Sequence, residues 1–534
     1  MTAGVLRPSG TADAGTPDAA RSDRSAFAAA LFSGIFPGLG QLYLGRRARA
    51  LGWAVLPLLG IALIVGVAVS HAARIGVLAQ LASPQGLMAA LAVNVALLVY
   101  RVAAVLDAWR GGTNRAAGPG ERPVVGSAPP SRGTHRRPGA LNLLSVAGLV
   151  LVIVTVALPH LAVGRVNLAI YDTLIGLNSG DSSPLGGQSE PDGGLTLPGI
   201  AGASGGPDAG SPPPGGILPT PTAAPAWNGT ERLNILLIGA DHRPGGGEYL
   251  TDTMIVASID PVTKQVAMFS LPRDTADVPL PAHWTATRGY PGGVFPRKIN
   301  SLYTVARQHP GAFPGNDAQR GFIALKGALG ELYHLDIKYY VAVDFEGFLT
   351  AMNAVGGVTV DVQVPVRDHH YPADDGRGAL NLYIQPGIQH FDGPEALAYA
   401  RARHETSDFD RGQRQQRILT SIAHQTDLSS LLIPGRLDAL FRAVHDTVKT
   451  DIPADLFPSL VTLADGIDLN AIRSIVFTPP KYSTVCYPCA PTNEYILRPD
   501  VAAIRQTVAD ALAAPASGAQ PTPSSASSGP SGAP

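Results

Sequence analysis

The stretch NILLIGADHRPGGGEYLTDTMIVASIDPVTKQVAMFSLPRD, residues 234–274, decides the fold of the globular part of this chain. It holds three runs rich in Ile, Leu, Val and Met, at residues 235–238, 254–259 and 266–271. Such runs are typical of buried strands in an α/β sheet, and Pro261 begins a turn between the last two. Because ligands of open α/β sheets collect at strand ends, the charged residues that flank these runs are candidates for a functional site. The alternative is a set of surface ion pairs.

The sequence beyond this stretch alternates strand-like and helix-like segments. A helical pattern covers residues 321–333, and the strand-like YYVAVDF and the helical EGFLTAMNAV follow it. Gly356 and Gly357 provide a stop signal for the second helix, and VTVDVQV then has the pattern of a further strand. This alternation favours an α/β fold, with helices packed on a sheet, for one globular domain over residues 231–514.

The N-terminal part contains three long apolar spans that are almost free of Lys, Arg, Asp and Glu. A helix needs about 20 such residues to cross a bilayer. We therefore predict transmembrane helices at residues 50–73, 85–106 and 140–163, within an α-helical membrane region of residues 26–170. Residues 33–45 are apolar but interrupted by proline and glycine, so we expect a re-entrant or interfacial segment there.

Arginines that flank the spans predict their orientation. Arg46, Arg47 and Arg49 precede the first span, and six arginines lie between the second and the third. By the positive-inside rule the N-terminus is cytoplasmic, and the domain that follows the third span lies outside. The net charge of −1 gives no basic field, so we expect no nucleic-acid partner.

The remaining segments are rich in Gly, Pro, Ala, Ser and Thr, a composition that cannot bury a core. We expect disordered tails at residues 1–25 and 515–534, and a flexible linker at residues 176–229 that tethers the domain to the membrane. Cys486 and Cys489 are the only cysteines, and their spacing favours a local disulfide outside the cytoplasm. Two thiols cannot complete a zinc site by themselves.

A second group of charged residues lies in the segment RARHETSDFDRGQRQQ, residues 401–416. Arg401 and Arg403 stand two positions apart, so they point the same way if the chain is extended there. A helix is then expected from Asp408 onwards. Because guanidinium groups match phosphate oxygens bidentately, converging arginines suggest a diphosphate ligand, whereas the alternative is a solvated helix face of mixed charge.

Carboxylates beside a diphosphate would be repelled by it unless a metal ion lay between them. Asp241 and Asp252 are therefore interpreted as oxygen ligands for Mg²⁺ or Mn²⁺, which take one or two carboxylates together with phosphate oxygens and water. The cations that we expect to converge on the same ligand are Arg273, Lys298, Arg401, Arg403, Arg411 and Arg414.

The motifs NILLIGADHR, TDTMIVASIDP, FSLPRD, KINSLY, GGVTVDV and FDGPEALAYARARHETSDFDRGQRQQ, in this order, resemble the extracellular catalytic domain of the LytR-CpsA-Psr family. The resemblance covers residues 232–430 and implies a central mixed β-sheet flanked by helices. It also implies an enzyme of the bacterial cell membrane that transfers a glycopolymer from a polyisoprenyl (undecaprenyl-type) diphosphate carrier to peptidoglycan. The first two spans and the long linker depart from the single-pass pattern of the family.

Carried over residue by residue, the resemblance implies that Asp241 and Asp252 hold the metal and that the arginines hold the diphosphate. Either Asp274 or Asp408 is expected to accept the proton of the incoming sugar hydroxyl. The predicted catalytic residues are Arg273, Asp274, Arg401, Arg403 and Asp408, and the predicted substrate-binding residues are Arg243, Lys298, Arg411, Arg414 and Gln415.

Two other functions fit the same residues. Water in place of the sugar hydroxyl would make the site a polyisoprenyl diphosphate hydrolase. A non-catalytic, cell envelope-related regulator (transcriptional attenuator) could bind the same lipid without chemistry. In each case the isoprenoid tail requires an apolar trough, which we expect between the sheet and its helices.

Overall fold

The structure is a computed structural model, and it describes the following residues: 25–116, 143–178, 227–241, 249–372, 378–403, 407–432, 436, 440, 448–489 and 493–513. The two predicted tails and the predicted linker at 176–229 lie almost entirely outside the described residues. The chain forms two compact units, one of residues 1–69 and 90–165 and the other of residues 70–89 and 166–534.

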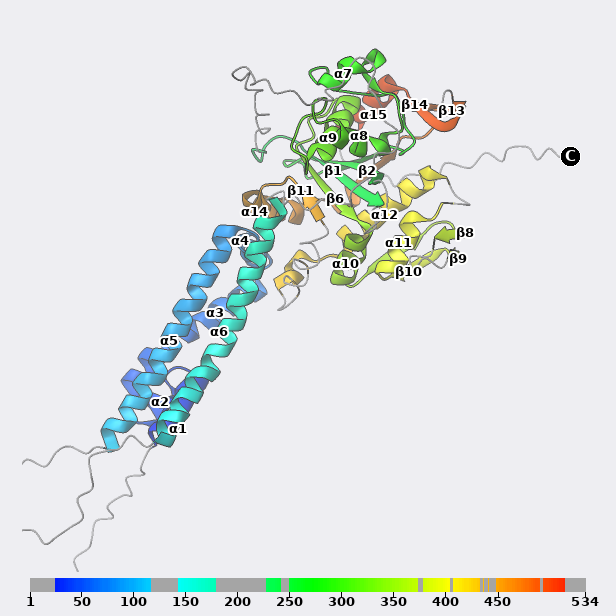
Figure 1. Cartoon of the computed structure of the whole chain (residues 1–534). Coiled ribbons are helices and arrows are strands. Elements are labelled where there is room, and N and C mark those ends of the chain that lie inside the picture. The colour runs from blue at the N-terminus through cyan, green and yellow to red at the C-terminus, as the bar shows by residue number, and fades with distance from the viewer. Residues whose placement is uncertain are drawn as a thin grey trace, which may run out of the picture. The chain divides into compact units, whose positions relative to one another are not determined.

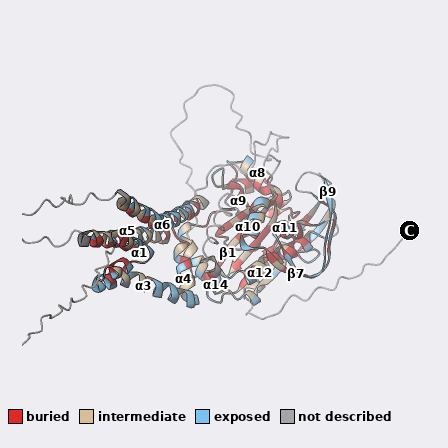
Figure 2. Cartoon of the chain, turned by 90° about the horizontal axis from the view of Figure 1, so that it is seen from below, coloured by how far each residue is buried: buried red, intermediate tan, exposed pale blue. Residues whose placement is uncertain are grey.

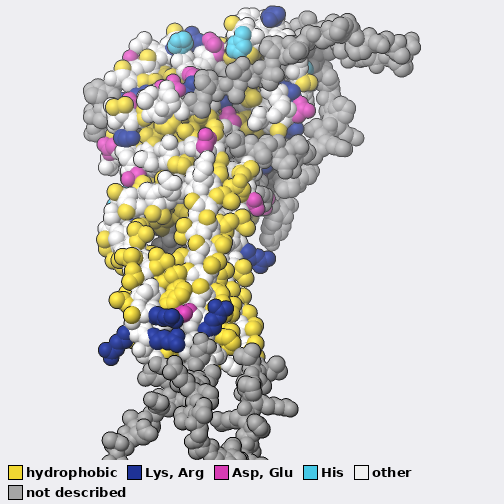
Figure 3. All heavy atoms as spheres, turned by 90° about the vertical axis from the view of Figure 1, so that its left-hand side faces the viewer, with side chains coloured by type: hydrophobic (Ala, Val, Ile, Leu, Met, Phe, Trp, Pro, Cys, Tyr) yellow, Lys and Arg dark blue, Asp and Glu magenta, His cyan; other side chains and the backbone are white. Residues whose placement is uncertain are grey.

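Among the described residues, three helices are long and apolar enough to cross a membrane, as the sequence predicts: α3 (Arg47–Val69), α5 (Pro84–Ala116) and α6 (Leu143–Asn178) (Figure 1). Most residues of α3 are exposed, as lipid-facing residues would be (Figure 2). Apolar side chains cover the middle of the helical unit, whereas Lys and Arg side chains gather at one end (Figure 3). The chain is therefore a membrane-associated protein.

The first of these helices ends at Val69, four residues before its predicted end. Ser70 leaves the helical conformation and caps the next helix, α4 (His71–Leu81), by accepting a hydrogen bond from the Ala73 amide at 3.3 Å. The stretch predicted to be re-entrant or interfacial, residues 33–45, contains the end of α1 (Ala26–Ile35) and the short helix α2 (Leu39–Tyr43).

The globular domain is built on a six-stranded sheet with the order β11-β6-β1-β2-β3-β12. β1 runs parallel to β6 and β3 runs parallel to β12, whereas the other neighbours are antiparallel. The mixed α/β fold predicted from the sequence is thereby confirmed. The strands are β1 (Leu233–Asp241), β2 (Leu250–Ile259), β3 (Val266–Ser270), β6 (Tyr339–Asp344), β11 (Val448–Thr450) and β12 (Arg473–Val476).

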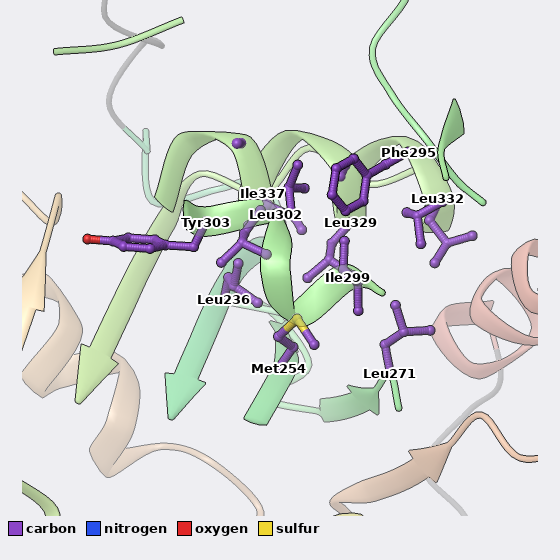
Figure 4. Packing of buried hydrophobic residues seen from close by; sticks show 14 of the residues in the cluster. Leu236, Met254, Leu271, Phe295, Ile299, Leu302, Tyr303, Leu329, Leu332 and Ile337 are labelled. Carbon is purple, nitrogen blue, oxygen red and sulfur yellow. The ribbon is translucent and has the colours of Figure 1, made fainter. Parts of the chain in front are cut away.

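One face of this sheet is buried under helices α8, α9 and α15. Alternate residues of β1 and β2, such as Leu236 and Met254, pack there against Leu302 and Leu329 (Figure 4). Burial of each such side chain contributes about 1.5–3 kcal/mol to folding, which fixes the register of both strands. The helices are α8 (Leu302–Gln308), α9 (Arg320–Tyr333) and α15 (Val501–Ala513).

The opposite face of the sheet is covered by helices α10, α11 and α12, which share a second core with small strands. Val358, Val360, Tyr399 and Ile418 belong to this core. The strand predicted at VTVDVQV is present as β7. It does not belong to the main sheet but pairs with β10 in a separate two-stranded sheet. The elements are α10 (Phe345–Val355), α11 (Gly393–Arg401), α12 (Asp408–Gln425), β7 (Val358–Val362), β10 (Gly387–Phe391), β8 (Val366–Pro372) and β9 (Ala379–Ile384).

Short elements complete the domain. They are β4 (Val278–Pro279), β5 (Val294–Phe295), β13 (Ser483–Cys489), β14 (Glu494–Pro499), α7 (Thr285–Gly289), α14 (Phe457–Asp465), and the 3₁₀ turns Pro291–Gly293, Ile299–Ser301, Leu428–Leu432, Ala454–Leu456 and Leu469–Ala471. Cys486 and Cys489 form a disulfide within β13, which agrees with the pairing favoured by their spacing.

Candidate active site

A β-bulge in β2 decides where the side chain of Asp252 points. Gly239 of β1 pairs with Thr253, but the next residue, Ala240, pairs with Thr251, so Asp252 is the extra residue of the bulge. In a regular strand Asp252 would share the buried face of Met254, two residues further on. The bulge instead places Asp252 and Thr253 together on the other face, and both line a cavity there.

Two further carboxylates stand at the ends of neighbouring strands. Asp241 ends β1, and Asp344 ends β6, the parallel neighbour of β1. Both residues line the same cavity as Asp252. Asp344 also caps α10, because its Oδ1 accepts a hydrogen bond from the Gly347 amide at 2.8 Å. Arg243, a predicted substrate-binding residue, lies outside the described residues.

Helices α11 and α12 bring the second charged segment to this cavity. Asp392 and Glu395 form a capping box at the start of α11, and Ser407 and Asp410 form one at the start of α12. These boxes fix where each helix begins, and with it which residues face the sheet. The cavity-lining residues of the segment are Arg401, Arg403, Arg411 and Gln415.

The backbone around Arg401 and Arg403 differs from the predicted extended conformation. α11 continues through Arg401, whose guanidinium lies 3.9 Å from the centre of the Phe345 ring, in a cation–π contact. The chain becomes extended only at Ala402, and the Arg403 amide donates to Asp368 Oδ2 at 3.0 Å. The expectation that an extended strand aligns the two arginines is therefore wrong, although both line the cavity.

The cavity has a volume of about 460 Å³ and lies between the sheet and helices α10, α11 and α12. Its wall along the strands is apolar, since Leu237 and Val341 line it and precede Asp241 and Asp344 along their strands. Charged side chains therefore gather where the strands end. The other apolar lining residues include Ile255, Phe348, Leu397, Ile418 and Leu419.

Arg273 lines the cavity and also contacts a network of charged residues that do not line it, called here the network behind Arg273. Its Nη1 lies 2.8 Å from Asp252 Oδ1, and its Nε lies 3.4 Å from Asp408 Oδ2. Asp408 is also 3.4 Å from Arg411 Nη1, and Lys298 Nζ is 2.8 Å from Asp274 Oδ1. These side chains are between 6% and 27% exposed, so solvent screens the pairs less than it screens surface ion pairs.

Asp274 and Asp408 form a hydrogen-bonded acid pair. Burial and the hydrogen bond with Asp408 raise the pKa of Asp274, while Lys298 and Arg273 oppose the shift. Burial would also raise the pKa of Asp408, but Arg411, the hydrogen bond from Asp274 and Arg273 together lower it. Asp408 therefore loses its proton at a lower pH than Asp274, and between their two pKa values the pair carries one negative charge.

Several predicted site residues lie outside the cavity lining. Asp274, Asp408 and Lys298 belong to the network behind Arg273. Arg414 is buried, and its guanidinium donates to the carbonyls of Tyr399, at 2.8 Å, and Ala402. It therefore ties α12 to the end of α11 and does not face the cavity as a substrate-binding residue would.

Asp344, Phe345 and Asp368 also line the cavity but do not appear among the predicted site residues. Asp344 ends a predicted strand, so the rule that selected Asp241 also applies to it. Phe345 stacks on Arg401, and the buried Asp368 accepts from the Arg403 amide, but these contacts join segments far apart in sequence. No sequence spacing indicates them.

The carboxylates of this site are too few to hold a metal ion alone and would need the oxygens of a bound phosphate to complete its shell. The described part of the chain contains no group of three or more His, Cys, Asp or Glu side chains that could hold a metal ion. Mg²⁺ takes one or two carboxylates, and phosphate oxygens and water complete its shell. Asp241 and Asp252 line one cavity from adjacent strands, so this pair fits such a shell.

Fold and site together define the class of protein: a membrane-anchored α/β protein whose apolar cavity carries arginines and aspartates at the strand ends. The sequence profile of the LytR_cpsA_psr family matches residues 219–490, and the chain belongs to this family. The family that the ordered motifs predict is thereby confirmed.

Individual relatives agree with this assignment. The chain is 29% identical over 276 residues to the polyisoprenyl-teichoic acid–peptidoglycan teichoic acid transferase TagV of Bacillus subtilis, covering 50% of this chain and 61% of TagV. It is 32% identical over 245 residues to the correspondingly named TagU of Oceanobacillus iheyensis, covering 45% of this chain and 65% of TagU. This chain spans only about three-fifths of these relatives. The crystal structure of B. subtilis TagV is 26% identical, covers 53% of this chain and 98% of that chain, and has a TM-score of 0.40.

Proposed function

We propose that this chain is a membrane-anchored phosphotransferase that moves a glycopolymer from a polyisoprenyl diphosphate carrier to peptidoglycan. The observation that carries the proposal is the cavity, which is apolar along the strands and charged where they end. Such a cavity suits an amphiphile with an isoprenoid tail and a diphosphate head. The names of the relatives, transferases of teichoic acid from a polyisoprenyl carrier to peptidoglycan, support the same class of reaction.

The reaction has the sugar hydroxyl attack the phosphorus that carries the glycopolymer. A phosphorus–oxygen bond to the acceptor forms, the bond to the bridging oxygen of the diphosphate breaks, and the lipid phosphate leaves with the electron pair. Arg273, Arg401 and Arg411 line the cavity and bind the phosphate oxygens bidentately, which stabilises negative charge on the leaving phosphate. Mg²⁺ or Mn²⁺ bound to Asp241 and Asp252 would neutralise further charge on the diphosphate.

The acid pair behind Arg273 accepts the proton of the sugar hydroxyl. Because the pKa of Asp408 is lowered and that of Asp274 is raised, Asp408 ionises first and is the member of the pair that accepts the proton. Arg273 and Arg411 both contact Asp408, so the base is connected directly to the groups that hold the phosphates. Proton acceptance and charge neutralisation can then occur together.

The proposed topology places this domain outside the cell, beside lipid-linked donors and the wall. Arginines before the first span and between the second and third spans support it. A reporter fused after residue 513 should be active only outside the cytoplasm. Activity only inside would reject the orientation, because peptidoglycan would then be out of reach.

The transferase is tested with the full-length protein in lipid nanodiscs, a polyisoprenyl diphosphate-linked glycan, Mg²⁺ and peptidoglycan. The expected product is a covalent glycan–peptidoglycan adduct. Phosphorylated glycan released without an adduct would show a hydrolase, and bound but unchanged donor would show a lipid-binding regulator. Arg401→Ala and Asp252→Ala should abolish transfer in a folded protein, whereas Arg288→Ala, at an exposed arginine of α7, should not change it.

A further inference from the structure

The hairpin of β13 and β14 is attached directly to the segment that carries the acid pair. The Leu497 amide donates to the Asp274 carbonyl at 2.9 Å, and the Ala276 amide donates to the Leu497 carbonyl at 2.9 Å. Thr275 and Leu497 thereby form a parallel bridge. The position of β14 relative to Asp274 is therefore fixed by backbone hydrogen bonds.

Tyr495 lies on the same face of β14 as Leu497, two residues nearer to the turn. Leu497 is buried against the domain, whereas Tyr495 is 36% exposed, so its ring stands at the surface beside the Asp274 segment. Burial raises the pKa of the Tyr495 hydroxyl, and the nearby carboxylates of Asp274 and Asp408 raise it further. This shift agrees with a phenol ring close to both acids.

A disulfide and an ion pair hold the exposed surface of this hairpin in place. Its register shifts between Cys486 and Cys489, so Tyr487 and Pro488 form a bulge, closed by the disulfide, on the strand that neighbours Tyr495. Tyr487 is 71% exposed. Arg498 Nε lies 3.3 Å from Asp277 Oδ2, which ties β14 to the loop after Asp274.

The cavity and Tyr495 are connected to the acid pair through different residues. The cavity lining includes Arg273 and Arg411, which contact Asp408, but it includes neither Asp408 nor Tyr495. A donor lipid in the cavity therefore approaches the acids through the arginines. An acceptor sugar that packs on Tyr495 does not have to enter the cavity that holds the donor.

We propose that Tyr495, with the exposed Tyr487 of the neighbouring strand, forms a subsite for the acceptor glycan, a claim that rests on the proposed transferase function. The C–H face of a pyranose ring is apolar and packs on an aromatic ring, while its hydroxyl groups stay at the edge. A sugar on Tyr495 presents a hydroxyl to the Asp274–Asp408 pair. Tyr487 lies within the family match, which ends at residue 490, whereas Tyr495 lies beyond it.

The test uses the full-length protein in nanodiscs, a short-chain polyisoprenyl diphosphate-linked donor and a soluble peptidoglycan tetrasaccharide. Tyr495→Ala should raise the KM for the tetrasaccharide about three- to tenfold, the loss expected for one aromatic contact. The donor Kd should not change, since Tyr495 does not line the cavity. Tyr495→Phe keeps the ring and should retain most acceptor binding, and Tyr383→Ala, at an exposed tyrosine of β9, is the matched control.

Two outcomes would overturn the subsite: an unchanged acceptor KM in Tyr495→Ala, or an equal loss of donor binding. Saturation-transfer NMR with the tetrasaccharide alone separates this failure from failure of the transferase. If the wild-type protein makes no adduct but binds the tetrasaccharide through Tyr495, the transferase is wrong and the subsite stands. If the tetrasaccharide gives no signal with the wild-type protein, the subsite is wrong whatever the activity.

Discussion

Replacing Arg414 by alanine separates an arginine that holds the fold from the arginines that line the cavity. The substitution removes two hydrogen bonds from a charged donor, to the carbonyls of Tyr399 and Ala402. Each contributes about 1.5–3 kcal/mol, and part of this is offset because the guanidinium no longer has to be buried. That burial already lowers the pKa of Arg414. We expect the junction of α11 and α12 to lose about 2–4 kcal/mol of local stability.

Amide hydrogen exchange of α12 in the full-length protein measures this loss, because it reports local opening without global unfolding. A loss of 2–4 kcal/mol corresponds to exchange about 30- to 700-fold faster. Arg403→Ala is the control, since Arg403 is exposed and lines the cavity, so it should leave exchange unchanged while it weakens donor binding. If Arg414→Ala left α12 exchange unchanged and abolished donor binding instead, Arg414 would be a ligand and the structural role would be wrong.

Three more predictions concern chemistry, the bulge and the lipid. Because the pKa of Asp274 is raised, its proton leaves as pH rises above the ordinary aspartate range. Its loss adds a second carboxylate beside Asp408 and makes the pair a stronger base, so the transfer rate should rise there. Asp274→Asn should remove this inflection, and Asp408→Asn should slow transfer about 10²- to 10⁴-fold in the same pH series. Gly239→Ala would put a Cβ 2.9 Å from the Thr253 Cβ at the bulge and so displace Asp252. Turnover should fall about 100-fold, while the melting temperature shows that the protein is still folded. Unchanged turnover would reject the role of the bulge. In the wild-type protein the donor Kd should fall as the isoprenoid becomes longer. Phe348→Glu places a charge in the apolar wall of the cavity, so the donor Kd should become independent of isoprenoid length. If the dependence remained, the lipid would bind elsewhere.

Strands and candidate acids could be predicted from the sequence because they depend on local patterns. The apolar runs around Leu236 and Met254 indicate strands, and the charges at their ends indicate Asp241 and Asp252. Even so, simple alternation would have buried Asp252 beside Met254. Only the register of β1 against β2 reveals the bulge that turns it into the cavity.

Arginines show the limit of sequence reasoning more clearly. Arg411 and Arg414 are one helical turn apart and have the same chemistry, so composition gives no reason to separate them. In the structure Arg411 lines the cavity, whereas the guanidinium of Arg414 donates hydrogen bonds to backbone carbonyls at the end of α11. Which role an arginine takes depends on where two helices meet, and that contact is not encoded in local spacing. Tyr495 is found in the same way, through its strand's bridge to the Asp274 segment.

The most direct measurement is a crystal structure of the protein with Mn²⁺ and a polyprenyl diphosphate, with the metal located by anomalous scattering. The account predicts a manganese peak between Asp241 and Asp252, diphosphate oxygens within hydrogen-bond distance of Arg273 and Arg401, and the isoprenoid chain in the cavity of about 460 Å³. A diphosphate bound away from these arginines, with the isoprenoid outside the cavity, would contradict it.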